Sequence, residues 1–254
     1  MIVFSILAIS SLFFIGLFFG SFLNVVIDRL PKNESIVRGR SHCESCNHIL
    51  SWIDLIPLLS YFSTNGKCRY CHVALSLKYP LFEVVTGVLF AESFYVLAIG
   101  KGFESLITFP FILNVIYSLY ILSSFLIIFF IDLEHGFIPD KIVYPGIIVS
   151  LIYLLFVHFD VNFLLAALAA FIFFYAIYFF TKKRGMGFGD VKLAILLGLF
   201  LGFPKIVIAL YIAFLTGAAI SLILVIAKKK KFHGGSIPFG PFMVIGALIA
   251  FFLR

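Results

Sequence analysis

The sequence predicts an all-α protein that crosses a membrane several times and carries one polar insert after its first helix. Three observations lead to this fold class: 63% of the 254 residues are hydrophobic, only 12% are charged, and the apolar residues lie in long uninterrupted runs. Soluble domains are about 45–50% apolar and about 25% charged. The mean hydropathy of +1.16 therefore favours a chain that is solvated largely by lipid.

Eight apolar runs are expected to form the membrane-crossing helices. A helix needs about 20 apolar residues to cross the hydrocarbon core, within a range of about 17–25. The first run is not expected to be a cleaved signal peptide, because it is long and lacks a basic start and an Ala-x-Ala site. The expected spans, of which the sixth is the shortest, are Ile2–Ile27, Leu81–Ile99, Leu106–Ile131, Ile142–Val157, Phe163–Phe180, Val191–Phe203, Ile206–Ala227 and Ile237–Leu253.

The net charge of +7 is explained by membrane topology and does not require a nucleic-acid partner. Lys and Arg collect on the cytoplasmic side of membrane proteins. With the N-terminus outside, sixteen of the nineteen basic residues fall on that side, and only Lys101, Lys205 and Arg254 lie outside. The run Lys228–Lys231 would then anchor the chain or contact anionic lipids.

All four cysteines lie in the polar insert of residues 28–80. Two Cys-x-x-Cys pairs, Cys43/Cys46 and Cys68/Cys71, are separated by 21 residues, and this pattern is typical of a zinc site. Four thiolates leave no open coordination position, so the zinc is expected to be structural. Such an ion would staple an insert that is too small to hold a good core. A redox-active pair is the alternative, and the nearby His42, His48 and His72 are expected to be surface residues rather than ligands.

Two carboxylates stand at the ends of apolar runs. Asp132 follows Leu119–Ile131, and Asp190 follows the turn Gly187-Phe188-Gly189. A charge at the edge of a bilayer is costly unless it faces a cavity or a partner. Each aspartate alone could be a helix cap, as could Asp140. Together, in two glycine-rich breaks on one side of the membrane, they predict a pair that shares one proton, as in aspartyl proteases.

This pair could carry out hydrolysis by general acid–base catalysis. One carboxylate would take a proton from water while the other protonates the scissile carbonyl oxygen. A serine hydrolase is not favoured, because the chain has no Gly-x-Ser-x-Gly elbow. The roles of the neighbouring Glu134 and of Asp140 are left open.

Taken in order along the chain, these motifs resemble the bacterial type IV prepilin peptidases, and the second aspartate motif is the GxGD of presenilin-like intramembrane proteases. The resemblance runs nearly end to end and rests on Gly20–Pro31, the two cysteine pairs, Ser51–Pro57, Lys78–Glu83, Asp132–His135 with Ile138–Asp140, Gly187–Asp190 and Ile237–Pro241.

The resemblance implies a bifunctional enzyme of the bacterial inner membrane. Such enzymes cleave the short basic leader of type IV prepilins and pseudopilins after a Gly, and then methylate the new N-terminal residue with S-adenosylmethionine. Carried over by residue, Asp132 and Asp190 would be the catalytic pair, with the active site at the cytoplasmic face. The resemblance also implies a division into a first transmembrane helix (1–27), a four-cysteine zinc-type module associated with methyl transfer (28–80) and a peptidase bundle (81–254).

The residues that would hold the methyl donor are not predicted, because no Rossmann Gly-x-Gly-x-x-Gly follows a strand. Two alternatives to the enzyme remain: a proton-coupled transporter with intramembrane carboxylates, and an inactive assembly scaffold. Transporters are often built from inverted repeats, and no internal repeat is evident in the sequence.

Overall fold

The computed structural model describes residues 2–182, 186–226 and 238–253. Within these residues it is all-helical, with two isolated β-bridges and no strand, which confirms the predicted fold class. The chain divides into two compact units, Met1–Thr108 and Phe109–Arg254. The lysine run Lys228–Lys231 and the first residue of the last expected span, Ile237, lie outside the described residues.

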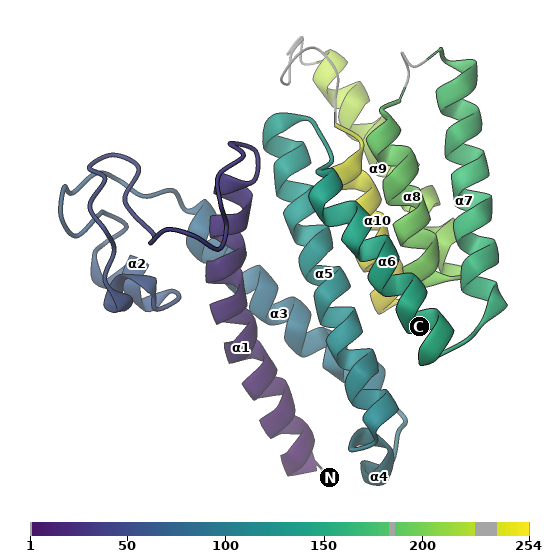
Figure 1. Cartoon of the computed structure of the whole chain (residues 1–254), viewed down its shortest axis with the longest axis horizontal. Helices are drawn as coiled ribbons and strands as arrows, with labels where there is room; N and C mark the ends of the chain where they lie inside the picture. Colours follow the sequence, from purple (N-terminus) through teal and green to yellow (C-terminus); the bar gives the residue numbers. More distant parts are fainter. Residues whose placement is uncertain (1, 183–185, 227–237, 254) are drawn as a thin grey trace. The chain divides into compact units, whose positions relative to one another are not determined.

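Each of the eight expected apolar runs forms a helix over most of its described length (Figure 1), although the expected span Leu106–Ile131 is interrupted at Ile107 and Thr108. Five of these helices are long and apolar enough to cross a membrane: α1 (Ile2–Arg29), α3 (Lys78–Ala98), α5 (Phe109–His135), α7 (Val161–Phe180) and α9 (Lys205–Ile226). The other three are shorter: α6 (Asp140–Phe156), α8 (Phe188–Leu201) and α10 (Gly240–Phe252). A one-turn helix, α4 (Phe103–Leu106), precedes α5.

In the first unit, α1 and α3 pack side by side through glycines. A Cβ on Gly16 would lie 2.7 Å from the Cα of Gly87, and a Cβ on Gly20 would lie 2.8 Å from the Cα of Glu83. Small residues of this kind let membrane helices approach closely where the hydrophobic effect cannot drive them together. The close contact holds together the two helices whose facing ends the polar insert connects.

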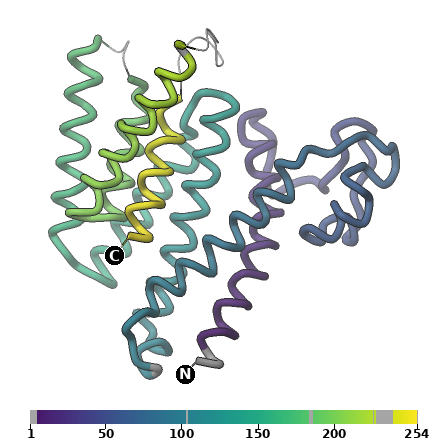
Figure 2. Tube along the Cα trace, turned by 180° about the vertical axis from the view of Figure 1, so that it is seen from behind, coloured from purple at the N-terminus to yellow at the C-terminus, as the bar shows by residue number. Residues whose placement is uncertain are grey.

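The insert between α1 and α3 has little regular structure, as Figure 2 shows. It contains one 3-10 turn, η1 (Trp52–Leu55), and the short helix α2 (Leu59–Ser63). The two isolated bridges pair His42 with Ile49 and Lys67 with Ala74. Both bridges flank cysteine pairs, so the insert is organised around its cysteines, as the sequence predicts.

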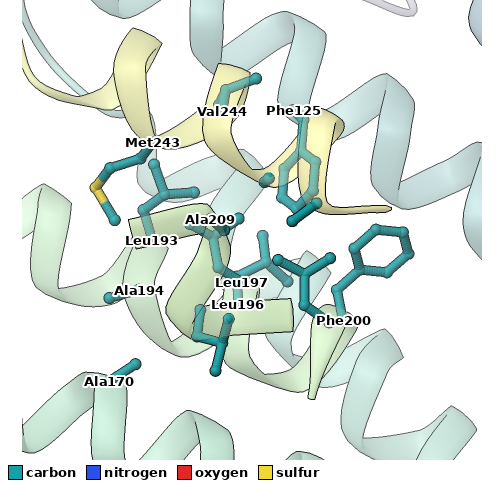
Figure 3. Packing of buried hydrophobic residues seen from close by; sticks show 14 of the residues in the cluster. Phe125, Ala170, Leu193, Ala194, Leu196, Leu197, Phe200, Ala209, Met243 and Val244 are labelled. Carbon is teal, nitrogen blue, oxygen red and sulfur yellow. The ribbon is translucent and has the colours of Figure 1, made fainter. Parts of the chain in front are cut away.

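In the second unit, α8 is enclosed by the other helices. Nearly all of its residues from Asp190 to Leu201 are buried, and Figure 3 shows its leucines packed among side chains such as Phe125 of α5 and Met243 of α10. A helix that is apolar on every side is typical of a fully enclosed position. The sequence identified the run as a span, but only the packing shows that its neighbours are protein.

Close backbone contacts also hold the second unit together. A Cβ on Gly198 of α8 would overlap the Cα of Ala167 in α7, and a Cβ on Gly246 of α10 would overlap the carbonyl oxygen of Ala209 in α9. The α9–α10 pair is seen side by side from behind in Figure 2. The helix α3, which the sequence analysis grouped with the peptidase bundle of residues 81–254, packs with α1 in the first unit; the functional division of the chain stays a prediction.

Candidate functional site

Asp132 lies in the last turn of α5, next to a sharp exit of the chain. The helix ends at His135, and Gly136 takes a φ of +72°, which glycine adopts without steric cost. The side chain of Asp132 is buried, with a relative exposure of 4%, and its Oδ2 has no hydrogen-bond partner among the described residues. A buried carboxyl oxygen without a partner is uncommon and calls for a functional explanation.

Asp190 lies in the first turn of α8. It is also buried, at 8% exposure, and the backbone N–H of Gly187 donates a 3.1 Å hydrogen bond to its Oδ2. Asp190 therefore does cap the helix, because its side chain accepts a hydrogen bond from the backbone of the N-cap residue Gly187. This cap does not exclude a second role, because the bond uses only one of the two carboxyl oxygens.

The structure brings the two aspartates together around Ile138. A Cβ on Gly189, the neighbour of Asp190, would lie 3.0 Å from the Cβ of Ile138, and a Cβ on Gly240 would lie 3.2 Å from its Cδ1. The same atom on Gly240 would overlap Oδ2 of Asp132. The two carboxyl groups are close enough to interact electrostatically, so the second unit holds a buried pair of carboxyl groups at one end.

Asp140 is not the N-cap of α6, which corrects that alternative. The N-cap is Pro139, and Asp140 is the first helical residue. Its Oδ1 instead forms an ion pair with Nζ of Lys192 in α8. The ammonium group of Lys192 also lies 5.2 Å from the ring centroid of Tyr144 and 5.4 Å from that of Phe188.

This ion pair is a feature that the sequence analysis missed. Lys192 follows Asp190 by two residues, and its sequence position alone marks it only as one of the basic residues expected on the cytoplasmic side. The pair joins the first residue of α6 to the fifth residue of α8, and so it connects the two segments that carry Ile138 and Asp190. Gly240 was also missed as a site residue, although the motif that contains it was noted.

The four cysteines of the insert form one cluster in the first unit. Their Sγ atoms all lie within 4.8 Å of one another, and those of Cys43 and Cys71 are 3.9 Å apart. A tetrahedral zinc ion with Zn–S bonds of about 2.3 Å requires sulfur atoms about 3.8 Å apart. The cluster therefore fits a metal ion held by four thiolates, as the spacing predicts.

The two halves of the cluster have the same backbone structure. The N–H of Cys43 donates to the carbonyl of His48, and that of Cys68 donates to the carbonyl of Val73. The outer bond from Leu50 to Ser41 is likewise matched by one from Leu75 to Gly66. The expectation of no internal repeat is thus wrong for this segment: two equivalent loops, which we call knuckles (residues 41–50 and 66–75), follow each other 25 residues apart.

The backbone turns back after each cysteine pair, and in the second pair it favours the thiolate form of Cys68. Asn47 and His72 occupy equivalent positions and take positive φ values of 55° and 58°, which turn the chain back after each cysteine pair. Backbone N–H groups of Cys71 and Tyr70 point at the Cys68 sulfur and lower the pKa of Cys68 to about 7. The histidines at 42, 48 and 72 are exposed and lie outside the metal-ligating group, as expected.

Asp54 of η1 ties this helical turn to the second knuckle. Its carboxylate accepts a 2.7 Å bond from Nε of Arg69 and a 2.9 Å bond from the hydroxyl of Tyr70. It also accepts bonds from the backbone N–H and the hydroxyl of Ser51. Burial alone would raise the pKa of Asp54, but the hydrogen bonds prevail and lower it from 3.8 to about 2.

Replacing Asp54 by Asn should destabilise the cysteine insert at neutral pH. A carboxylate with a lowered pKa stabilises the folded state fully above its unfolded pKa, and the effect is lost as the pH falls from 3.8 to about 2. The difference between wild type and Asp54→Asn should thus stay constant between about pH 8 and about pH 5. Denaturant titration followed by the fluorescence of Trp52, the single tryptophan, measures it; a difference that shrinks across this range would contradict the assignment.

Comparison with known proteins assigns both units to one family. The model of the bacterial peptidase A24 N-terminal domain matches residues 14–97, within the first unit. The model of the type IV leader peptidase family matches residues 119–222, within the second unit. No solved structure matches the chain.

Curated relatives span most of the chain, and each carries the name prepilin leader peptidase/N-methyltransferase. The chain is 34% identical to the protein of Myxococcus xanthus over 86% of its own length, and it spans 64% of that relative. It is 30% identical to the protein of Aeromonas hydrophila over 95% of its length, and it spans 89% of that relative. It is also 30% identical to the protein of Pseudomonas aeruginosa, of which it spans 87%.

Proposed function

Because the chain belongs to the bacterial family of prepilin leader peptidase/N-methyltransferases, we propose that it removes the leader of type IV prepilins or pseudopilins and methylates the new amino terminus. The observation that carries the peptidase activity is the buried pair of Asp132 and Asp190 beside Ile138. The family relationship favours this activity over the transporter alternative.

In the proposed cleavage, Asp132 and Asp190 share one proton and hold the attacking water. The ionised carboxylate takes a proton from the water as its oxygen attacks the carbonyl carbon of the leader's last Gly, while the protonated carboxyl gives its proton to the carbonyl oxygen. Collapse of the tetrahedral intermediate breaks the C–N bond: the leaving amine takes a proton from one carboxyl group, and a hydroxyl group of the intermediate returns a proton to the other, so that the pair again holds one proton. Gly240 lies so close to Asp132 that there is no room for a side chain at position 240 on this side of the site.

The cysteine cluster is proposed to hold a structural zinc ion through Cys43, Cys46, Cys68 and Cys71. The sulfur separations support this assignment, and so does the all-thiolate ligand set, since thiolates suit zinc and leave no open position for a substrate. S-adenosylmethionine is proposed as the methyl donor, and it supplies the activated methyl group when bound.

The site is proposed to face the cytoplasm, in an inner-membrane protein whose N-terminus is outside. The distribution of Lys and Arg supports this orientation. In the second unit, the α5–α6 connection and the start of α8 lie at the same end of the bundle (Figure 1). That end carries Lys141, Lys182 and Lys192, so the aspartates lie at its basic side.

The purified, detergent-solubilised protein tests the function directly. It is incubated with a prepilin that has a basic leader ending in Gly, with and without S-adenosylmethionine, and the product mass is measured. Loss of the leader supports the peptidase, and an added methyl mass only with the donor supports the transferase. An intact prepilin in the presence of folded, zinc-loaded protein would contradict the proposal.

Replacing Gly240 by Ala should lower leader cleavage at least about 10-fold, because misplacing a catalytic group by about 1 Å can cost about 100-fold in rate. The new Cβ would overlap Oδ2 of Asp132 and lie 3.2 Å from its Cγ. The matched control is Gly102→Ala, whose Cβ would meet no atom within 4 Å. Equal cleavage rates for the two variants would show that Gly240 does not position Asp132.

A further inference from the structure

A cavity of about 820 Å³ with both polar and apolar walls lies in the first unit, where α1 and α3 meet the cysteine insert. Its walls include Asn24 and Asp28 of α1, Glu83 of α3, and Tyr61 of the insert. Ligand sites are typically concavities of about 300–1,000 Å³. We propose that this cavity is the site of S-adenosylmethionine, with Glu83 and Asp28 as its anionic anchors; the assignment rests on the methyl-transfer activity proposed above.

The cavity wall carries a buried polar atom that lacks a partner. Asn24 is 5% exposed, and its Nδ2 donates a 3.3 Å hydrogen bond to the carbonyl of Tyr79. Its Oδ1 is buried and has no hydrogen-bond partner among the described residues. Because buried polar groups are normally satisfied, this acceptor at the cavity wall indicates a missing donor from a bound molecule.

Two carboxylates are held at the same wall. Glu83 is 7% exposed, and its Oε2 accepts a 2.8 Å bond from the backbone N–H of Leu58. Asp28 accepts a 3.1 Å bond from the hydroxyl of Tyr79 and lies 3.5 Å from Nζ of Lys78. These contacts fix both carboxylates in place from the surrounding protein.

The Leu58 backbone that binds Glu83 is itself strained. Leu58 takes a φ of +61° and a ψ of −50°, a region that residues with a side chain rarely occupy. Such conformations persist only where the surrounding structure imposes them, and they cluster at functional sites. Here the strain turns an N–H toward the cavity carboxylate, so it contributes to positioning Glu83.

The chemistry of the wall fits a sulfonium nucleoside better than a phosphorylated one. S-adenosylmethionine carries a sulfonium and an ammonium cation, and carboxylates bind both. Its ribose hydroxyl groups donate hydrogen bonds, which acidic residues accept in nucleotide sites. Three of the lining cations are engaged by the protein: Arg29 with the carbonyls of residues 35 and 40, Lys32 with Glu44, and Arg69 with Asp54. The aromatic ring of Tyr61 and the side chains of Val25 and Leu55 offer apolar surface to adenine.

The reaction at this site balances without a further reactant. The neutral amine of the cleaved pilin attacks the methyl carbon, a C–N bond forms as the C–S bond breaks, and the electron pair stays on sulfur. The products are S-adenosylhomocysteine and a methylated amine, and the extra proton on nitrogen passes to water at the open side of the cavity.

Photolabelling of the wild-type protein tests the location without any substitution. An azidoadenine analogue of S-adenosylmethionine is bound to the full chain in detergent and irradiated, and the labelled peptide is identified by mass spectrometry. Label within residues 21–83, competed away by S-adenosylhomocysteine, supports the proposal. Competed label confined to other residues overturns it.

Substitution of Glu83 tests the anchor. Calorimetric titration with S-adenosylhomocysteine, whose ammonium and ribose groups are the same, should show at least about a 10-fold weaker affinity for Glu83→Gln than for the wild type, since a charge-assisted bond is lost. The matched control is Glu92→Gln, an exposed residue of the same helix, which should bind like the wild type.

The outcomes separate this inference from the proposed function. If the wild type methylates pilin and Glu83→Gln binds the ligand with unchanged affinity, the cavity assignment is wrong and the methyltransferase stands. If the wild type cleaves but neither binds the donor nor methylates, the transferase itself is wrong, and the cavity assignment falls with it. Zinc content and thermal melting of Glu83→Gln show whether the first unit is folded.

Discussion

Replacement of either Asp132 or Asp190 by Asn is expected to lower the rate of leader cleavage by roughly 100- to 10,000-fold, the usual contribution of a general acid or base. Asn keeps the volume of the carboxyl group but can neither take a proton from water nor give one to the carbonyl oxygen. Since both residues are needed in one proton cycle, the double variant should be hardly slower than either single one.

The fold should survive these substitutions, so that loss of activity can be attributed to chemistry. In Asp190→Asn the amide oxygen can still accept the bond from the N–H of Gly187, and in Asp132→Asn no hydrogen bond to Oδ2 is lost. Helical content by circular dichroism and elution volume in detergent provide the check. Glu134→Gln, at the residue before the last of the same helix, is the control and should cleave; cleavage at the wild-type rate by either Asn variant would exclude the pair.

The residues at the centre of both sites could be predicted because their signals are local. Asp132 and Asp190 stand out as charges beside apolar runs, and the cysteine pairs stand out by spacing. The structure places the two aspartates together and gathers the four sulfurs. Their catalytic and zinc-binding roles stay predictions, which the experiments above address.

The features of the site that could not be predicted from the sequence are contacts between segments that are far apart along the chain. Gly240 contacts Asp132 across more than a hundred residues, and no local pattern marks such a contact. The ion pair of Asp140 with Lys192 was likewise hidden, because a carboxylate at a helix start is read first as a cap. The repeat of the two knuckles is not visible in the sequence, because it consists of equivalent backbone hydrogen bonds. The side chains at equivalent positions, such as His48 and Val73, differ.

A double substitution, Cys43→Ser with Cys68→Ser, is expected to abolish stoichiometric zinc binding. These are the two buried cysteines, one from each knuckle, so the variant would leave one exposed thiolate on each side. Zinc binding in small four-ligand modules contributes about 10–16 kcal/mol of apparent free energy, and an insert with one short helix and one 3-10 turn has little else to hold it. We therefore expect the segment around the cysteines to unfold while α1 and α3 remain helical.

Metal analysis of the purified variant measures the loss, and the fluorescence of Trp52 in η1 reports the unfolding. The matched control replaces two neighbouring histidines, His42→Gln with His48→Gln; it should keep one zinc per chain, because neither ring belongs to the metal-ligating group. One zinc retained in the cysteine variant would exclude the four-thiolate site. Loss of zinc in the histidine variant would instead show that an imidazole replaces a thiolate. Because Cys43 and Cys68 also line the cavity that holds Glu83 and Asp28, unfolding of the insert should remove pilin methylation together with the metal.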